Sequence, residues 1–286
     1  MINDNANRGD RDGGDDAALP ILDVRPADAF AAGHRAGSAN IPLEELTARM
    51  YELPPRDAAL VVYDDDRTRA RWAASRLRAR GRNRVQPRSG ADWLAAEIIA
   101  TGSSRVRLWQ PHRCLTDALK LARTFWLSLA GRRAIDLACG TGRDAVYLAL
   151  SGFDVDACDV LPDALERCRA MAARHDVAIS AFECDLEGSP RLSVDRYDLV
   201  SCFNFLHRPL FPQIAAALAA GGLVVYETFV DPQRARFGKP SREAHVLKRG
   251  ELKAAFANLD VLVYREGLAG PRRCAATLIA RKRADA

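Results

Sequence analysis

The sequence comprises 286 residues, and its 48% hydrophobic content is sufficient for one large core or two smaller ones. The net charge of +5 comes from arginines spread along the whole chain without interleaved aromatic residues, so we expect no nucleic-acid partner. No apolar run reaches about 18 residues, so no membrane span is expected. The seven cysteines are irregularly spaced and form no Cys-x-x-Cys pair, so neither a disulfide framework nor a metal site is expected.

Composition divides the chain into three parts. Residues 1–18 are rich in Asp, Asn, Gly and Arg, and we predict a disordered leader there. This segment lacks the apolar stretch of a signal peptide, so a cytoplasmic protein is expected. We expect a small α/β domain over 19–102 and a larger domain, including a linker with Gly-Ser-Ser, over 103–286.

Short apolar runs alternate with helical patterns in both expected domains. In the first domain, strands are predicted over 21–24 and 60–63, and helices over 27–32, 43–53, 70–80 and from 91 onward. In the second, strands are predicted over 134–137, 155–158, 179–182, 199–203, 223–226, 261–264 and 276–280, and helices over 115–130, 143–150, 164–174, 212–220 and 252–257. This alternation predicts a mostly parallel sheet with helices on both faces, a doubly wound α/β fold, closed by a hairpin.

A glycine turn follows the first strand of the second domain. The segment from Asp136 to Asp144 leads from strand to helix through Gly140 and Gly142, which permit a sharp turn and the close approach of a ligand. The Gly-x-Gly spacing also satisfies the dinucleotide-binding fingerprint, with Asp159 about 20 residues further on. A nicotinamide or flavin cofactor therefore stays open as an alternative.

Two carboxylates in this turn bear on the choice of ligand. Asp144 lies in the first turn of the helix, where it would repel a pyrophosphate, and Asp136 at the strand end would add to this repulsion. The same charges suit S-adenosylmethionine, which carries an ammonium and a sulfonium group and no phosphate. Alternatively, Asp144 is only a helix-dipole partner, Asp159 a helix cap and Asp185 a turn residue.

The motif Asp136-Leu-x-x-Gly140-x-Gly142 resembles motif I of the class I S-adenosylmethionine-dependent methyltransferases. The resemblance extends from about residue 105 to the C-terminus and implies a Rossmann-like fold with S-adenosyl-L-methionine as the cofactor. It implies that the two glycines line the methionine end, that Asp159 binds the ribose, and that Asp185 with Leu186 frames the adenine. The implied cofactor-binding residues are Asp136, Gly140, Gly142, Asp159, Val160, Asp185, Leu186 and Phe203.

Residues 139–146 and 205–209 resemble, more narrowly, the tellurite-resistance-type methyltransferases. Methyl transfer from a sulfonium is an in-line displacement that depends on alignment, so we assign no catalytic residue. Arg143, His207 and Arg208 are our candidates for contact with the acceptor, a small oxyanion or thiol. Alternatively, His207 and Arg208 only cap a turn.

We expect His112 and His245 at the surface or between the domains. Glu227, at a strand end, either faces the pocket or binds a backbone amide, and the sequence leaves both open.

The first domain resembles the rhodanese family through Leu22-Asp-Val-Arg25 and a following Gly-His-x-x-Gly segment. Rhodaneses carry sulfur on a cysteine directly after the Val-Val-Tyr strand, where this chain has Asp64. Because no cysteine precedes Cys114, we predict that sulfurtransferase activity is absent. The domain is expected to bind an anion through Arg67 and Arg69, to recruit a protein partner, to cover the methyltransferase pocket, or to act only as a packing module.

The leading interpretation is therefore a methyltransferase for a small-molecule acceptor with an inactive rhodanese-like domain. One alternative is a nucleotide-cofactor oxidoreductase, which NAD binding would indicate. The other is a non-catalytic S-adenosylmethionine-binding sensor or interaction protein, which ligand binding without turnover would indicate.

Overall fold

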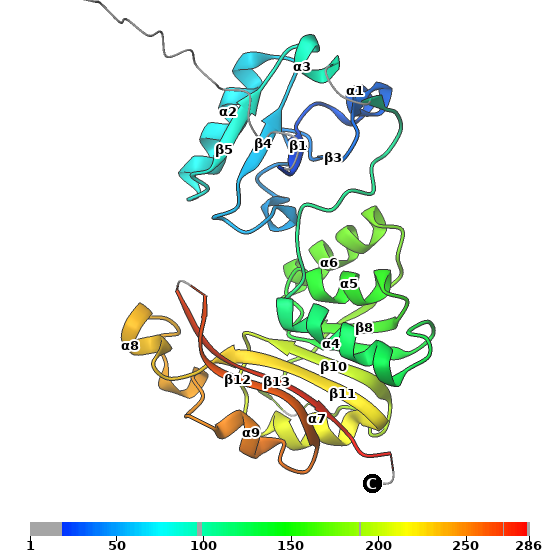
Figure 1. The fold of residues 1–286 in the computed structure, drawn as a ribbon, viewed down its shortest axis with the longest axis vertical. Coiled ribbons are helices and arrows are strands. Elements are labelled where there is room, and N and C mark those ends of the chain that lie inside the picture. Colours follow the sequence, from blue (N-terminus) through cyan, green and yellow to red (C-terminus); the bar gives the residue numbers. More distant parts are fainter. Residues whose placement is uncertain (1–18, 96–98, 189, 271, 285–286) are drawn as a thin grey trace, which may run out of the picture. The chain divides into compact units, whose positions relative to one another are not determined.

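The chain forms two compact units, Met1–Gln110 and Pro111–Ala286, in the computed structural model (Figure 1). The model describes residues 19–284 apart from 96–98, 189 and 271. The leader predicted over 1–18 lies outside these residues. No helix in the described part of the chain is long and apolar enough to cross a membrane.

The first unit contains a parallel four-stranded sheet in the order β3-β1-β4-β5. The strands are β1 (Ile21–Asp23), β3 (Ser38–Asn40), β4 (Leu60–Tyr63) and β5 (Val85–Arg88). The other elements are α1 (Ala27–Ala32), α2 (Arg67–Ala79), α3 (Ala91–Ala95) and an antiparallel pair formed by β2 (His34–Arg35) and β6 (Ile99–Ala100). Every residue of β4 is buried, which explains its continuous apolar sequence.

The prediction of an α-helix over 43–53 is wrong. This segment forms successive turns and ends in a short 3₁₀ helix, Met50–Glu52. The backbone N–H groups of Glu45 and Leu46 bond to carbonyls three residues back, which is the spacing of turns and not of an α-helix. Leu43, Leu46 and Leu53 are buried in the core of the unit, so packing fixes the path of this segment.

The second unit contains a seven-stranded sheet in the order β12-β13-β11-β10-β7-β8-β9. The strands are β7 (Arg133–Leu137), β8 (Asp154–Asp159), β9 (Ser180–Glu183), β10 (Tyr197–Phe203), β11 (Leu218–Phe229), β12 (Asp260–Gly270) and β13 (Arg273–Arg281). The first five are parallel, while β13 is antiparallel to both β11 and β12. The mostly parallel sheet and the closing hairpin are confirmed.

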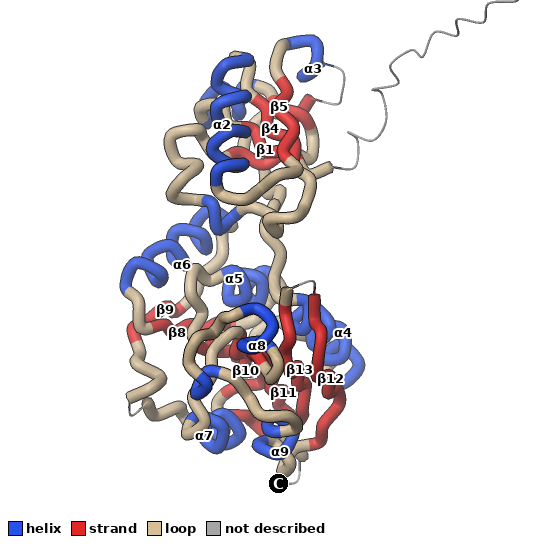
Figure 2. The backbone as a smooth tube through the Cα atoms, turned by 90° about the vertical axis from the view of Figure 1, so that its left-hand side faces the viewer, coloured by secondary structure: helices blue, strands red, loops and turns tan. Residues whose placement is uncertain are grey.

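Helices cover both faces of this sheet (Figures 1 and 2). One apolar cluster joins the sheet to α4 (Arg113–Phe125), α5 (Arg143–Leu150) and α6 (Pro162–Arg174). A second cluster joins the opposite face to α7 (Leu210–Ala217) and α9 (Glu251–Ala255), and the short helix α8 (Gln233–Phe237) precedes α9. The doubly wound architecture is therefore confirmed.

The order of the strands reverses beside β7. The chain passes from β7 to β8 on one side, whereas β10 and β11 lie on the other side. In open α/β sheets a crevice forms at such a reversal, outside the carboxyl ends of the strands. The architecture thus directs attention to the loops that follow β7 and β10.

Candidate functional site

A cavity of about 290 Å³ opens at the carboxyl ends of β7 and β10. Its walls come from the strand ends, the glycine turn, the start of α5 and the residue preceding α4. The lining residues are His112, Asp136, Ala138, Cys139, Gly140, Thr141, Arg143, Asp144, Phe203, Asn204 and Phe205. Four of the residues predicted for a site therefore meet here: Asp136, Gly140, Arg143 and Phe203.

The glycine turn reaches the cavity through a left-handed backbone. Ala138, Gly140 and Gly142 all have positive φ, at 53°, 55° and 81°. A Cβ added at Gly142 would lie 2.2 Å from Sγ of Cys168 on α6, whereas one added at Gly140 would meet no atom within 4 Å. Gly142 is thus required for the packing of α6, while Gly140 leaves open space for a ligand.

The two carboxylates of the turn lie in the same cavity but in different environments. Asp136 is only 2% exposed and accepts a hydrogen bond from Ser201 Oγ at 2.7 Å. Burial, together with the charge of Asp144, raises the pKa of Asp136 well above its usual value. Asp144 is also buried, and its two oxygens accept hydrogen bonds from the backbone N–H and Nδ1 of His112, both at 2.7 Å.

His112 lines the cavity, so the sequence-based expectation that it lies at the surface or between domains is corrected. Its ring stacks on Phe203 with 4.3 Å between centroids, and its Nε2 lies 3.2 Å from Asn204 Nδ2. In the sequence, Asp144 is 32 residues from His112, Phe203 is 91 and Asn204 is 92. No local pattern marks His112, because it precedes α4 and reaches its partners only through the fold.

The residues predicted to hold the ribose and adenine follow β8 and β9. Asp159 accepts hydrogen bonds from the N–H groups of Gly140 at 2.8 Å and Leu161 at 3.0 Å, which ties the end of β8 to the glycine turn. Next to it, the Val160 side chain is 51% exposed. Asp185 accepts a hydrogen bond from Glu187 N–H at 2.9 Å, and Leu186 is buried.

Two of the three predicted acceptor contacts lie away from this cavity. Arg143 is exposed at the start of α5 and lines the cavity. His207 does not line it. Arg208 forms a salt bridge with Glu251 and donates to the carbonyls of Ala244 and Val246, so its guanidinium is engaged within the loop next to α9.

A second cavity, of about 330 Å³, lies between α4 and the end of the β12–β13 hairpin. Glu227 of β11 lines it, and its carboxylate accepts hydrogen bonds from Arg273 at 2.8 Å and Thr277 at 2.7 Å. Glu227 therefore faces a pocket and binds side chains, not a backbone amide. The other lining residues are Arg113, Cys114, Asp117, Arg265, Glu266, Gly267, Leu268, Ala269, Ala275 and Thr277.

The backbone connects the two cavities at two places. His112 of the first is followed directly by Arg113 and Cys114 of the second. The N–H of Asn204 in the first cavity donates to the carbonyl of Glu227 in the second, at 2.9 Å. The cavities are thus neighbours within the second unit.

In the first unit, aspartates of the loop after β4 accept hydrogen bonds from backbone N–H groups of that loop and of the start of α2. Asp64 accepts a hydrogen bond from the N–H of Asp66 at 3.0 Å, and the Asp66 carboxylate caps α2 by accepting from the N–H groups of Thr68 and Arg69. Arg69 itself is paired with Asp64 at 3.0 Å and with Glu44 at 3.2 Å. An anion at this loop would therefore compete with carboxylates already present for Arg69 and for the backbone donors.

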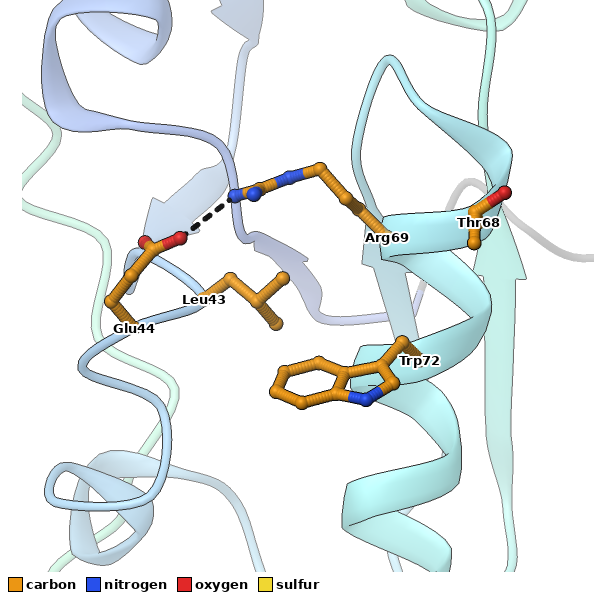
Figure 3. A pocket seen from close by; sticks show the side chains of 5 residues that line it. All are labelled: Leu43, Glu44, Thr68, Arg69 and Trp72. Carbon is orange, nitrogen blue, oxygen red and sulfur yellow. Dashed lines mark hydrogen bonds and ion pairs between the residues drawn. The ribbon is translucent and has the colours of Figure 1, made fainter.

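A mostly apolar pocket of about 310 Å³ lies beside this loop. Figure 3 shows Leu43 and the indole of Trp72 facing the hollow from the chain before the 3₁₀ helix and from α2, with Arg69 reaching across to Glu44. Trp72 is 47% exposed. This pocket offers apolar surface and the hydroxyl of Thr68, but its lining includes no thiol.

Comparisons with known proteins agree with both parts of this description. Residues 134–222 match the methyltransferase domain family and residues 7–90 the rhodanese-like domain family. The uncharacterized protein UNK4.09 of Schizosaccharomyces pombe is 24% identical, over 85% of this chain and 86% of its own length. A ubiquinone biosynthesis O-methyltransferase of Bordetella avium is 28% identical, over 46% of this chain and 60% of its own length.

TehB from Haemophilus influenzae aligns over 59% of this chain and 62% of its own, with 21% identity and a TM-score of 0.49. The rhodanese-like match falls within the first unit and the methyltransferase match within the second. The chain therefore carries a rhodanese-like domain followed by a methyltransferase domain.

Proposed function

We propose that the second unit transfers a methyl group from S-adenosylmethionine to a small-molecule acceptor. The observation that carries this proposal is the pair of buried carboxylates, Asp136 and Asp144, in a cavity at a glycine turn. The charge of Asp144 stabilises an ammonium or sulfonium group and repels a pyrophosphate, and a cation bound beside Asp136 would favour ionisation of that carboxyl group as well. The cavity therefore favours a cationic ligand without phosphates.

The remaining residues also fit this cofactor. The open space over Gly140 admits the methionine end, and Asp159 offers a carboxylate to ribose hydroxyls beside the same turn. Val160 and Leu161, 51% and 60% exposed, leave apolar surface next to Asp159 for an adenine ring. The cofactor supplies an electrophilic methyl group when bound, and the protein aligns the acceptor and excludes water.

We place the acceptor in the second cavity, which adjoins the first at His112 and Asn204. Its walls combine carboxylates and arginines with the apolar side chains of Leu268 and Ala275, which suits a small molecule of mixed polarity. The sequence-based expectation of an oxyanion or thiol acceptor rests on three candidate side chains, Arg143, His207 and Arg208. Of these three, only Arg143 lines the first cavity. The name of the Bordetella relative adds an oxygen acceptor as a class to test.

Isothermal titration of the purified chain with S-adenosylhomocysteine tests the cofactor, with NADH as the control ligand. We expect S-adenosylhomocysteine to bind with micromolar affinity and NADH not to bind. Binding of NADH alone would instead support a dinucleotide cofactor, and binding of neither ligand by folded protein would contradict the proposal.

For the rhodanese-like domain we propose a binding role without sulfurtransferase activity. Asp64 stands where a persulfide-forming thiol is required, and the neighbouring Asp66 occupies two of the loop's backbone donors. The wild-type chain should therefore form no thiocyanate from thiosulfate and cyanide. Asp64→Cys is the matched variant: thiocyanate from this variant alone would identify the missing thiol as the defect, and thiocyanate from the wild type would contradict the proposal.

A further inference from the structure

The imidazole of His112 is held in one orientation by three side chains. Asp144 binds Nδ1 at 2.7 Å, Phe203 stacks on the ring, and the amide of Asn204 lies 3.2 Å from Nε2. The backbone N–H of His112 also donates to Asp144, which fixes the segment that carries the ring. The side chain is 21% exposed and forms part of the cavity wall.

These contacts determine which ring nitrogen is free to take a proton. An ionised carboxylate only accepts hydrogen bonds, so Nδ1 of His112 carries the proton that it shares with Asp144. The lone pair of the neutral ring is then on Nε2, and the amide of Asn204 donates to it over a long distance of 3.2 Å. An incoming hydroxyl or thiol can take the place of this weak donor.

We propose that His112, oriented by Asp144, is the proton acceptor of the methyl transfer, and that the methyl acceptor binds as a neutral molecule with an O–H or S–H group. This inference rests on the proposed methyltransferase function. The oxygen or sulfur forms its bond to the methyl carbon while the bond from that carbon to the sulfonium sulfur breaks, and the electron pair of the broken bond passes to the sulfur. The proton of the acceptor moves to Nε2, and the resulting imidazolium is stabilised by Asp144.

The charges around the ring support this direction of proton transfer. Asp144 and Arg143 face it from α5, Asp136 from β7 and Cys139 from the glycine turn. The two carboxylates are buried, whereas Arg143 is exposed. Because solvent screens an exposed charge more strongly than a buried one, the Asp144 carboxylate at Nδ1 is the charge best placed to stabilise an imidazolium formed during the transfer.

The remaining neighbours of the ring are neutral or line the second cavity. Phe203 at the end of β10 and Asn204 after it are both neutral. Arg113 and Cys114, which follow His112 in the chain, line the second cavity and not the first. A preformed oxyanion at Nε2 would meet the charge of Asp144 across the ring and needs no base. The site therefore selects an acceptor that arrives protonated.

The experiment compares two acceptors that differ in their need for a base. The probes are 4-nitrothiophenol, which is largely a thiolate at neutral pH, and catechol, which is protonated there. For the wild type, transfer from S-adenosylmethionine should be measurable with both. In His112→Gln, kcat should fall about 100-fold or more with catechol and only slightly with 4-nitrothiophenol.

The controls separate a base from a residue that only supports the fold. His245→Gln, in the 3₁₀ helix Glu243–His245 outside both cavities, should keep the wild-type ratio of the two rates. Asp144→Asn, which removes the orienting charge, should lower the catechol rate more than the 4-nitrothiophenol rate. Equal losses with both acceptors in His112→Gln, or no transfer to catechol by the wild type, would overturn the inference.

Two measurements do not depend on turnover. S-adenosylhomocysteine should bind the wild type; if it does not, the proposed function itself fails. Nitrogen-15 spectra of the wild-type histidines should show neutral His112 with its proton on Nδ1. A proton on Nε2 would overturn the role of His112 while leaving the methyltransferase proposal intact.

Discussion

At the scale of single residues, the turn places a carboxylate where it costs stability. The folded state raises the pKa of Asp136 through burial and the neighbouring charge of Asp144. Between the ordinary value of 3.8 and the raised value, the native state therefore binds more protons than the unfolded state. The free energy of unfolding must fall as the pH rises through this window, and the stability contributed by protonated Asp136 is lost above it.

Asp136→Asn should remove this dependence. The amide oxygen can still accept the hydrogen bond from Ser201, but it carries no charge to desolvate. We expect the slope of the wild-type unfolding free energy, up to about 1.4 kcal/mol per pH unit, to flatten in the variant. Urea denaturation from pH 4 upward measures it, with the exposed Asp163→Asn as the control. Parallel curves for wild type and Asp136→Asn would show that Asp136 is not the responsible group.

Asp159 provides a second residue-scale prediction, on the affinity for the cofactor. Asp159→Ala removes the acceptor for Gly140 N–H and the carboxylate offered to the ribose. S-adenosylhomocysteine should bind more weakly by about 1 to 3 kcal/mol, through the loss of charge-assisted hydrogen bonds. Titration calorimetry measures the change, and unchanged affinity in a folded variant would remove Asp159 from the site.

The sequence predicts cavity-lining residues well where they lie at strand ends, and poorly where the fold brings them together from distant parts of the chain. Asp136, Gly140 and Phe203 were placed at strand ends by the pattern of apolar runs, and they do line one cavity. His112 was missed because its partners lie in α5 and after β10. Arg208 was predicted at the acceptor from its position beside the strand end, but its guanidinium pairs with Glu251.

At the scale of elements, apolar runs located the buried strands, and caps and packing decided the rest. The strand predicted over 134–137 is β7, Arg133–Leu137, and the predicted helix 143–150 agrees with α5. β5 was missed because Val85 is its only fully buried residue, so it carries no apolar run. The helix predicted over 115–130 ends at Phe125, where Trp126 adopts an extended backbone.

The contact between the glycine turn and α6 gives an element-scale prediction. Gly142→Ala would place a Cβ 2.2 Å from Cys168 Sγ and 3.1 Å from its Cα, at a φ of +81°. Strain and overpacking together should lower the free energy of unfolding by about 2 to 5 kcal/mol.

Gly140→Ala is the matched control, since it has a positive φ but open space around the new Cβ. It should cost only about 1 to 2 kcal/mol, from the backbone alone. Urea denaturation measures both variants. Equal costs would mean that α6 shifts to accommodate the added methyl group, so that the packing at Gly142 is not rigid.

At the scale of the whole molecule, each unit has a core of its own. The apolar cluster of the first unit includes residues from Leu22 to Leu108. The second unit has two clusters, one with residues from Cys114 to Ile279 and one with residues from Ile135 to Ala280. Among the residues that the structure describes, those that line the proposed cofactor cavity all lie in the second unit. Neither the fold nor the proposed cofactor site of the second unit therefore needs side chains from the first.

A chain consisting of residues 111–286 should consequently fold and bind S-adenosylhomocysteine. Both faces of its sheet keep their helices, because α4 through α9 all follow Pro111. We expect the dissociation constant to stay within a factor of about three of the full-length value, as for changes distant from a site. Calorimetry gives the affinity, and circular dichroism on heating shows whether unfolding is cooperative. A folded fragment that binds much more weakly would show that the rhodanese-like domain contributes to cofactor affinity, whereas a fragment without a cooperative transition would show that the second unit depends on the first for its fold.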